Sequence, residues 1–414
     1  MAMGTMEHPS YRAIAHAIRR RSAWSSGETI AFPGEGAEVL FLPARSRHGQ
    51  HLLGRDAYQC EAHGLAFPGE PIDDAPADCD IAENLDFRYP LLRERGAGTR
   101  RARRVVLLLH GLNERSFTKY VPWAHQLWRA TGAAVALFPL SFQVNRVLPQ
   151  WGRQVDQHLA RRRALARNQD VHGFNCVISE RLDAYPERFF WGGLQSYGDV
   201  VDLVREIRAG RHPQVDPEAQ VDLVGYSAGG YLALALLLVD DSGLFGESRA
   251  VIFESGAALR ATNMSSRFII DHACEVSLMK LYVRFTGRLA NARLSHWLRE
   301  HDVGRWFRAL CGDESERPRL EARLRELAPR LLGISNRNDE VIPAPAILNT
   351  LQGLHRDTGV RIEELSLGVH EHPFLCPDYA QRDRRFVTEF LDLPRYGAGF
   401  ERFVEATAEL LGAP

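Results

Sequence analysis

The sequence predicts an α/β protein built on a doubly wound, mostly parallel sheet. Short apolar runs, which fit strands buried on both faces, alternate with segments whose apolar residues recur at helical spacing. At residues 221–239 one such run passes through a turn of small residues directly into a strong helical pattern. A chain of 414 residues is long enough for one large domain of this kind with insertions.

The first part of the chain, residues 1–85, carries no chemical motif. Residues 11–20 fit a short helix, and residues 38–42 fit a strand that Pro43 would stop. The prolines, glycines and aspartates of residues 67–80 indicate a loop. We therefore expect residues 1–85 to be an N-terminal extension that packs against the main domain.

The main domain is expected over residues 86–414. Strands are predicted at residues 85–93, 105–109, 133–138, 221–224, 250–254, 330–335 and 362–367. Helices are predicted at residues 120–130, 197–209, 231–239, 344–358 and 379–391. Ser196 stands where the N-cap of the second of these helices would lie.

Two insertions, at residues 141–195 and 260–328, interrupt the alternation of strands and helices. Both leave from the carboxyl ends of strands, where open α/β sheets bind ligands, so we expect them to form a helical cap over the site. The alternative is a dimer interface or a packing layer remote from the site. The arginines at positions 161–163 are interpreted as a solvated helix face rather than an anion site. Aromatic side chains of the insertions suit an apolar pocket wall, and the candidates for substrate contact are Phe189, Phe190, Trp191 and Phe268. For the three consecutive aromatics, the core of the cap is an equal alternative.

Composition argues against several classes of function. A formal net charge of −1 makes no case for binding nucleic acid or an anionic membrane surface. None of the six cysteines forms a Cys-X-X-Cys pair, which disfavours a zinc ribbon or a thioredoxin-like site. No apolar run reaches the roughly 20 residues of a membrane span, and no signal peptide is visible. We expect a cytoplasmic protein that acts on a small molecule without a metal or cofactor.

The most informative stretch is Gly-Tyr-Ser-Ala-Gly at residues 225–229. A strand that enters a helix through Gly-X-Ser-X-Gly is a nucleophile elbow, in which a strained turn projects the Oγ of Ser227 clear of the sheet. Gly225 and Gly229 leave room where larger side chains would collide with the strand or the helix. The N-terminus of the helix directs free N–H groups at the same point, which favours developing negative charge. The alternative is an ordinary glycine-rich loop between a strand and a helix.

An elbow serine needs a base, an acid that orients the base, and an oxyanion hole. Asp339 follows one predicted strand, and His370 and His372 follow the next. Serine, acid and histidine therefore occur along the chain in the order expected when the serine lies at a strand-to-helix elbow. We favour His370 because of its Gly-X-His-Glu-X-Pro run, whereas the spacing to the neighbouring elements favours His372. Glu254, at the end of an earlier strand, is the alternative acid.

These residues resemble the α/β-hydrolase superfamily. The likeness covers roughly residues 86–414 without the insertions, and it includes His110-Gly111 after a buried strand, the elbow, Asp339 with Pro343 four residues later, and the histidine loop. These features are specific for the superfamily and do not identify one family within it.

The resemblance implies an α/β-hydrolase fold and a serine hydrolase in which Ser227 attacks an acyl carbonyl. It also implies that the backbone N–H groups of Leu112 and Ala228 form the oxyanion hole, while His110 shapes that loop and is not the base. The expected substrate is an ester, with a thioester or amide as second choice. An acyltransferase would use the same triad, and a catalytically silent binding module would use the same fold.

Overall fold

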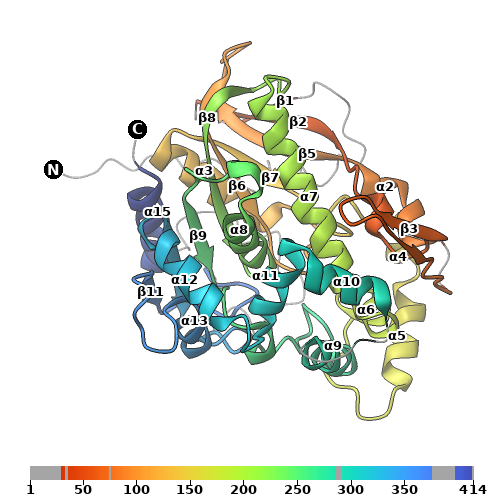
Figure 1. Cartoon of the computed structure of the whole chain (residues 1–414). Helices are drawn as coiled ribbons and strands as arrows, with labels where there is room; N and C mark the ends of the chain where they lie inside the picture. Colours follow the sequence, from red (N-terminus) through yellow and green to blue (C-terminus); the bar gives the residue numbers. More distant parts are fainter. Residues whose placement is uncertain are drawn as a thin grey trace.

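A computed structural model of the chain describes residues 29–32, 36–73, 76–285, 289, 291–374 and 397–412. The helices expected at residues 11–20 and 379–391 lie outside these ranges. Within them, a twisted sheet runs through the middle of the molecule with helices on both of its faces (Figure 1).

The sheet has nine strands in the order β1-β2-β5-β7-β6-β8-β9-β10-β11. Neighbours from β7 to β11 pair in parallel, whereas β1, β2, β5 and β7 are joined by antiparallel pairs. The mostly parallel sheet is thus confirmed, and its topology is that of the α/β-hydrolase fold. Its strands are β1 (Thr29–Ala31), β2 (Ala37–Arg45), β5 (Asp86–Glu94), β6 (Ala102–Leu109), β7 (Ala134–Phe138), β8 (Val215–Tyr226), β9 (Ala250–Phe253), β10 (Leu331–Asn336) and β11 (Arg361–Leu365).

Part of the expected N-terminal extension belongs to this sheet. Strand β2 pairs with β5 along its whole length, and a separate hairpin, β3 (Ala57–Cys60) with β4 (Leu65–Pro68), follows it. The prediction that Pro43 stops the strand is wrong, because β2 continues to Arg45. Among the described residues, β1 pairs with residues 38–40 of β2 and leaves Pro43 on a sheet edge, where the missing N–H is tolerated.

The helices complete two apolar layers, one on each face of the sheet. Alternate residues of β6 serve both layers, since Val105 and Leu107 belong to one cluster and Val106 and Leu108 to the other. On the second side pack α3 (Val121–Thr131) and α15 (Gly397–Leu411). On the first side pack α7 (Arg188–Arg208), α8 (Ala228–Val239), α12 (Arg317–Leu327) and α13 (Ala344–Leu351).

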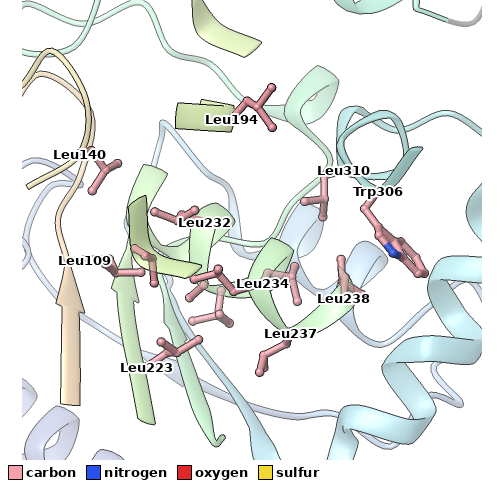
Figure 2. Packing of buried hydrophobic residues seen from close by; sticks show 14 of the residues in the cluster. Leu109, Leu140, Leu194, Leu223, Leu232, Leu234, Leu237, Leu238, Trp306 and Leu310 are labelled. Carbon is pink, nitrogen blue, oxygen red and sulfur yellow. The ribbon is translucent and has the colours of Figure 1, made fainter. Parts of the chain in front are cut away.

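Helix α8 lies at the centre of the first layer and is apolar on all sides. The sheet covers one side of it, and α11 (Asp302–Cys311) with α12 covers another. Figure 2 shows Leu234 and Leu238 of α8 among leucines of the sheet and the side chains of Trp306 and Leu310 from α11. A helix that is hydrophobic all round is stable only when it is enclosed in this way.

Three helices differ from the sequence prediction. Helix α7 begins at Arg188 rather than residue 197, so Ser196 is not its N-cap but an interior residue whose Oγ donates to Gly192 O at 3.0 Å. A Cβ at Gly192 would lie 3.1 Å from Ser141 Oγ, which indicates that close packing keeps glycine inside the helix. Helix α13 ends at Leu351 rather than residue 358, and α15 was not predicted.

The two insertions fold into helices that contact one another. The first contains α4 (Pro149–Arg153), α5 (Val155–Ala164) and α6 (Cys176–Ala184), and the second contains α9 (His272–Arg284), α10 (Ala292–Glu300), α11 and α12. No helix among the described residues is both long and apolar enough to cross a membrane.

A buried arginine joins the two insertions. The guanidinium of Arg162 on α5 donates to both carboxylate oxygens of Asp271, at 2.7 and 2.5 Å, and to Asp183 at 2.6 Å. Asp271 is also the N-cap of α9, where it accepts from the N–H of Cys274. The interpretation of a solvated arginine face is therefore wrong for Arg162, although Arg161 and Arg163 are exposed.

We expect Arg162→Met to lower the free energy of unfolding by about 3–5 kcal/mol, because it leaves the buried carboxylate of Asp271 and the partly buried carboxylate of Asp183 without their cation. The exposed neighbour provides a matched control, and Arg163→Met should change the same quantity by no more than about 0.5 kcal/mol. Urea denaturation followed by circular dichroism measures both. Equal stabilities of the two variants would show that the buried pairing does not hold the insertions together.

Candidate active site

Ser227 occupies the turn between β8 and α8 in a strained backbone conformation. Its φ of 54° and ψ of −120° are rare for a residue with a side chain. Its N–H donates to Phe253 O at 3.0 Å, and its carbonyl accepts from Ser255 Oγ at 2.7 Å. The end of the neighbouring strand β9 therefore holds the turn in place.

The glycines of the elbow are required by close backbone approaches. A Cβ at Gly225 would lie 2.3 Å from Gly229 O, and a Cβ at Gly229 would lie 2.2 Å from Leu109 O. The helix consequently begins directly against strands β6 and β8, as the motif predicts. The next residue, Gly230, is equally constrained because its Cβ would lie 2.4 Å from the Cβ of Ser255.

A chain of hydrogen bonds connects Ser227 to a histidine and a carboxylate. Ser227 Oγ lies 2.9 Å from His370 Nε2, and His370 Nδ1 lies 2.7 Å from Asp339 Oδ2. The other oxygen of Asp339 accepts from the N–H groups of Val341 and Ile342, both at 2.8 Å. A carboxylate in this position keeps the proton on Nδ1, which leaves the Nε2 lone pair facing the serine hydroxyl.

The two candidate histidines have different surroundings in the structure. The backbone carbonyl of His370 accepts a hydrogen bond from the hydroxyl of Tyr226, whose ring also stacks on that of His370. The ring of His372 lies instead edge-on against Phe268, and burial lowers the pKa of His372 to about 4. Of the two candidates, His370 is the one that the structure joins to Ser227.

Two carboxyl groups lie near His370 Nδ1, the ring nitrogen that faces away from Ser227, but at different distances. Asp339 lies at 2.7 Å and Glu254 at 3.5 Å. Burial raises the pKa of the Glu254 carboxyl well above its usual value, and the negative charge of Asp339 raises it further. Burial thus favours the neutral form of Glu254, and Asp339 is the carboxyl group that is hydrogen-bonded to the imidazole. These three side chains could also surround a cation, although the bond between His370 and Asp339 already occupies the two facing atoms.

His110 is a structural group of the loop that passes the serine. Its Nδ1 donates to Gly111 O at 2.8 Å and its Nε2 accepts from Leu140 N at 3.0 Å, while burial lowers its pKa to about 4. A Cβ at Gly111 would lie 3.3 Å from that of Ser227, so the loop runs directly beside the nucleophile. A neutral histidine with both nitrogens bonded can shape this loop but cannot accept a proton from Ser227.

The two expected oxyanion donors flank the serine. Leu112, Ser227 and Ala228 all line the same cavity. Because α8 begins at Ala228, the N–H of this residue has no acceptor within the helix. This arrangement suits a negative charge on a substrate oxygen.

Asn113 is a site residue that the sequence analysis missed. Its φ is 62°, and its Nδ2 donates to the carbonyls of Phe174 at 2.9 Å and Phe268 at 2.7 Å. One side chain thereby joins the loop beside Ser227 to both insertions. Its place directly after His-Gly-Leu, together with the tolerance of asparagine for positive φ, was the available signal.

A cavity of about 400 Å³ opens beside Ser227. Its wall is mostly apolar and comes from the sheet, from α8 and from both insertions, with side chains that include Leu140, Phe142, Ile178, Leu232, Ile269 and Leu310. Charged groups in the wall are few and include Arg181 and Arg188, which both pair with Asp78.

Two of the four aromatic candidates line this cavity. Phe189 and Phe190 do so, whereas Trp191 packs against Arg293 and Trp297 instead. Consecutive residues of a helix point about 100° apart, so three in a row cannot all face one cavity. Phe268 also lies outside the cavity wall and is 40% exposed.

Comparison with known proteins gives one match to a family and several distant structural likenesses. DUF6051, described as a family of unknown function, matches residues 18–393. No curated protein matches the sequence. Among solved structures, the chain is similar to a thermostable esterase from Pseudomonas putida, with 13% identity, a TM-score of 0.46, and coverage of 97% of this chain and 89% of that one. A hyperthermophilic esterase from the archaeon Pyrobaculum calidifontis has 11% identity, a TM-score of 0.45 and coverage of 97% and 88%. Carboxyl esterase 2 from the mycorrhizal fungus Tuber melanosporum has 15% identity, a TM-score of 0.41 and coverage of 98% and 99%.

The different roles of the two carboxyl groups can be tested by amide substitution. Asp339→Asn removes the carboxylate that holds the imidazole, and it should slow the reaction of Ser227 with a fluorophosphonate by on the order of 10³–10⁴. Glu254 lies farther from the imidazole and burial favours its neutral form, so Glu254→Gln, which has the same shape, should change the labelling rate by no more than about threefold. A large loss in Glu254→Gln with little loss in Asp339→Asn would reverse the assignment.

Proposed function

Because this chain belongs to DUF6051, a family of unknown function, we propose its activity from its own site: it is a serine hydrolase that cleaves a carboxylic ester. The observation that carries the proposal is the hydrogen-bonded sequence from Ser227 through His370 to Asp339, in a strained elbow beside an apolar cavity. A nucleophile next to a base that a third group orients is the arrangement needed for acyl transfer to serine.

In the first half of the reaction, His370 Nε2 removes the proton of Ser227 as Oγ attacks the acyl carbonyl carbon. The carbonyl oxygen becomes negatively charged and accepts hydrogen bonds from the N–H groups of Leu112 and Ala228. His370 then gives the proton to the leaving alcohol oxygen, the carbon–oxygen bond breaks, and the acyl group remains on Ser227. Asp339 stays ionised throughout and stabilises the transient imidazolium.

Water completes the cycle by the same route in reverse. His370 takes a proton from the water as its oxygen attacks the acyl-enzyme, and it returns that proton to Ser227 Oγ as the carboxylic acid departs. Both half-reactions use the same three side chains and the same backbone N–H groups. An acceptor alcohol in place of water would make the same site an acyltransferase.

The two insertions form a cap that selects the acyl or alcohol group. Phe189, Phe190, Ile178 and Leu310 belong to the insertions and contribute to the cavity wall. Each methylene group that enters such a wall from water contributes about 0.8 kcal/mol of binding free energy. An uncharged, apolar group therefore suits this cavity better than a charged one.

Replacing the nucleophile is the direct test of the proposal. Ser227→Ala should lower kcat/KM for p-nitrophenyl esters by on the order of 10⁴ to 10⁶, since it removes the hydroxyl that is hydrogen-bonded to His370. Ser366→Ala, at an exposed serine, serves as the control and should retain the activity. Near wild-type turnover by a folded Ser227→Ala protein would rule out a serine hydrolase. Adding acceptor alcohols to the same assay detects acyl transfer as a new ester product.

The cap is tested by changing the cavity wall. Phe189→Ala enlarges the cavity, and it should move the preferred p-nitrophenyl ester to a longer acyl chain. Phe268→Ala removes the same side chain outside the wall and should leave the chain-length profile unchanged. A shift in the second variant but not in the first would place the selecting surface elsewhere.

A further inference from the structure

A cluster of one cysteine and three histidines lies outside the triad and takes no part in the proposed reaction. Cys60, His63, His296 and His301 each bring one ligand atom to within 4.8 Å of the others. Cys60 Sγ lies 3.3 Å from both His63 Nδ1 and His301 Nε2. The three imidazole rings are almost perpendicular to one another, with centroids 4.8 to 5.2 Å apart. All four side chains thus converge on one point.

The four residues come from two distant parts of the chain. Cys60 ends β3, and His63 lies in the turn that leads to β4. His296 lies on α10, and His301 is the N-cap residue of α11. Figure 1 shows the β3 hairpin near α10 at the outer side of the molecule. Each half of the cluster has a short spacing, Cys-X₂-His and His-X₄-His, of the length found in zinc sites.

We propose that Cys60, His63, His296 and His301 bind one Zn²⁺ ion in a tetrahedral structural site. Zinc is bound by thiolate at about 2.3 Å and by imidazole at about 2.0–2.1 Å, so sulfur and nitrogen ligands of one tetrahedral ion lie about 3.6 Å apart. The two measured separations from Cys60 Sγ, both 3.3 Å, are close to this value. One thiolate with three imidazoles suits zinc, which accepts both ligand types.

A buried polar atom without a partner also favours a metal. The buried Nε2 of His296 has no hydrogen-bond partner among the described residues, a deficit that coordination would remove.

Hydrogen bonds among the four side chains explain their contacts less completely than a bound metal ion does. A thiol carries a single proton, so Cys60 can donate to only one of the two ring nitrogens that lie 3.3 Å from it. The other contact would need a ring N–H directed at sulfur, which is a weak acceptor. A deprotonated Cys60 with a cation at the centre makes all of these contacts favourable.

Neighbouring aromatic rings hold the histidines in position. The ring of His301 stacks on Trp297 with centroids 3.7 Å apart, and the ring of His296 lies 5.0 Å from that of Phe67. Side chains locked in this way lose little rotamer freedom on binding a metal, which favours affinity. Four protein ligands leave no open coordination position, so the ion would have a structural role.

The site would connect the β3 hairpin to the wall of the cavity. Val303 and Phe307 follow His301 on α11, and both line the cavity beside Ser227. Loss of the ion should therefore loosen this wall and lower the thermal stability of the chain. This consequence for the cavity rests on the proposed function, whereas metal binding itself does not.

Metal content and cobalt spectroscopy of the full-length protein test the site without an activity assay. The wild-type chain should contain about one equivalent of zinc by mass spectrometry, whereas Cys60→Ser and His301→Ala should retain less than about a tenth of it. Cys79→Ser replaces another buried cysteine, outside the cluster, and should retain the full equivalent. Titration of the apo protein with Co²⁺ should produce the visible bands of a tetrahedral ion and a thiolate-to-cobalt charge-transfer band, and Cys60→Ser should lack the latter.

Two results would overturn the proposal. One is a wild-type chain that is purified without metal and develops no charge-transfer band on titration with Co²⁺. The other is a folded Cys60→Ser variant with as much zinc as the wild type. If that variant does not fold, the cobalt titration of the wild type decides by itself. Fluorophosphonate labelling of Ser227, measured on the same samples, reports separately on the proposed hydrolase.

Discussion

The site depends on one steric constraint, the direct contact between the start of α8 and the strands beneath it. Gly225 and Gly229 have backbone atoms of the helix or of β6 at distances where no Cβ fits. This contact forces Ser227 into a conformation with positive φ, and hydrogen bonds with the end of β9 hold it there. Because the backbone and not a flexible side chain sets the position of Oγ, the nucleophile lies at a fixed point beside the first N–H groups of the helix.

Similar groups around that point have different surroundings. Asp339 accepts hydrogen bonds from two backbone N–H groups, whereas burial raises the pKa of Glu254 well above its usual value. Likewise His110 and His372 are held neutral by burial. Of the titratable groups described here, His370 is the one hydrogen-bonded to both a carboxylate and the serine hydroxyl.

Polar contacts tie the insertions that line the cavity to the sheet and to each other. Arg162 joins α5 to α9, and Asn113 joins the loop beside Ser227 to both insertions. The cluster around Cys60 does the same for the β3 hairpin and α11. Such contacts are directional, so they determine how the insertions are oriented as well as how stably they are attached. An apolar interface alone would leave that orientation, and the shape of the cavity, less well defined.

The sequence by itself determined the order of the buried strands, the elbow and the succession of serine, acid and histidine, since these depend on local periodicity and on sterics within a few residues. Only the tertiary structure decided between His370 and His372 and between Asp339 and Glu254, because each pair satisfies the same local pattern and differs in the direction of its side chains. Helix α7 extends through Gly192 for a similar reason, since packing against Ser141 outweighs the low helix propensity of glycine. Cys60 and His301 are 241 residues apart, and their contact arises from the folding of an insertion against the N-terminal region. No local spacing in the sequence predicts that contact.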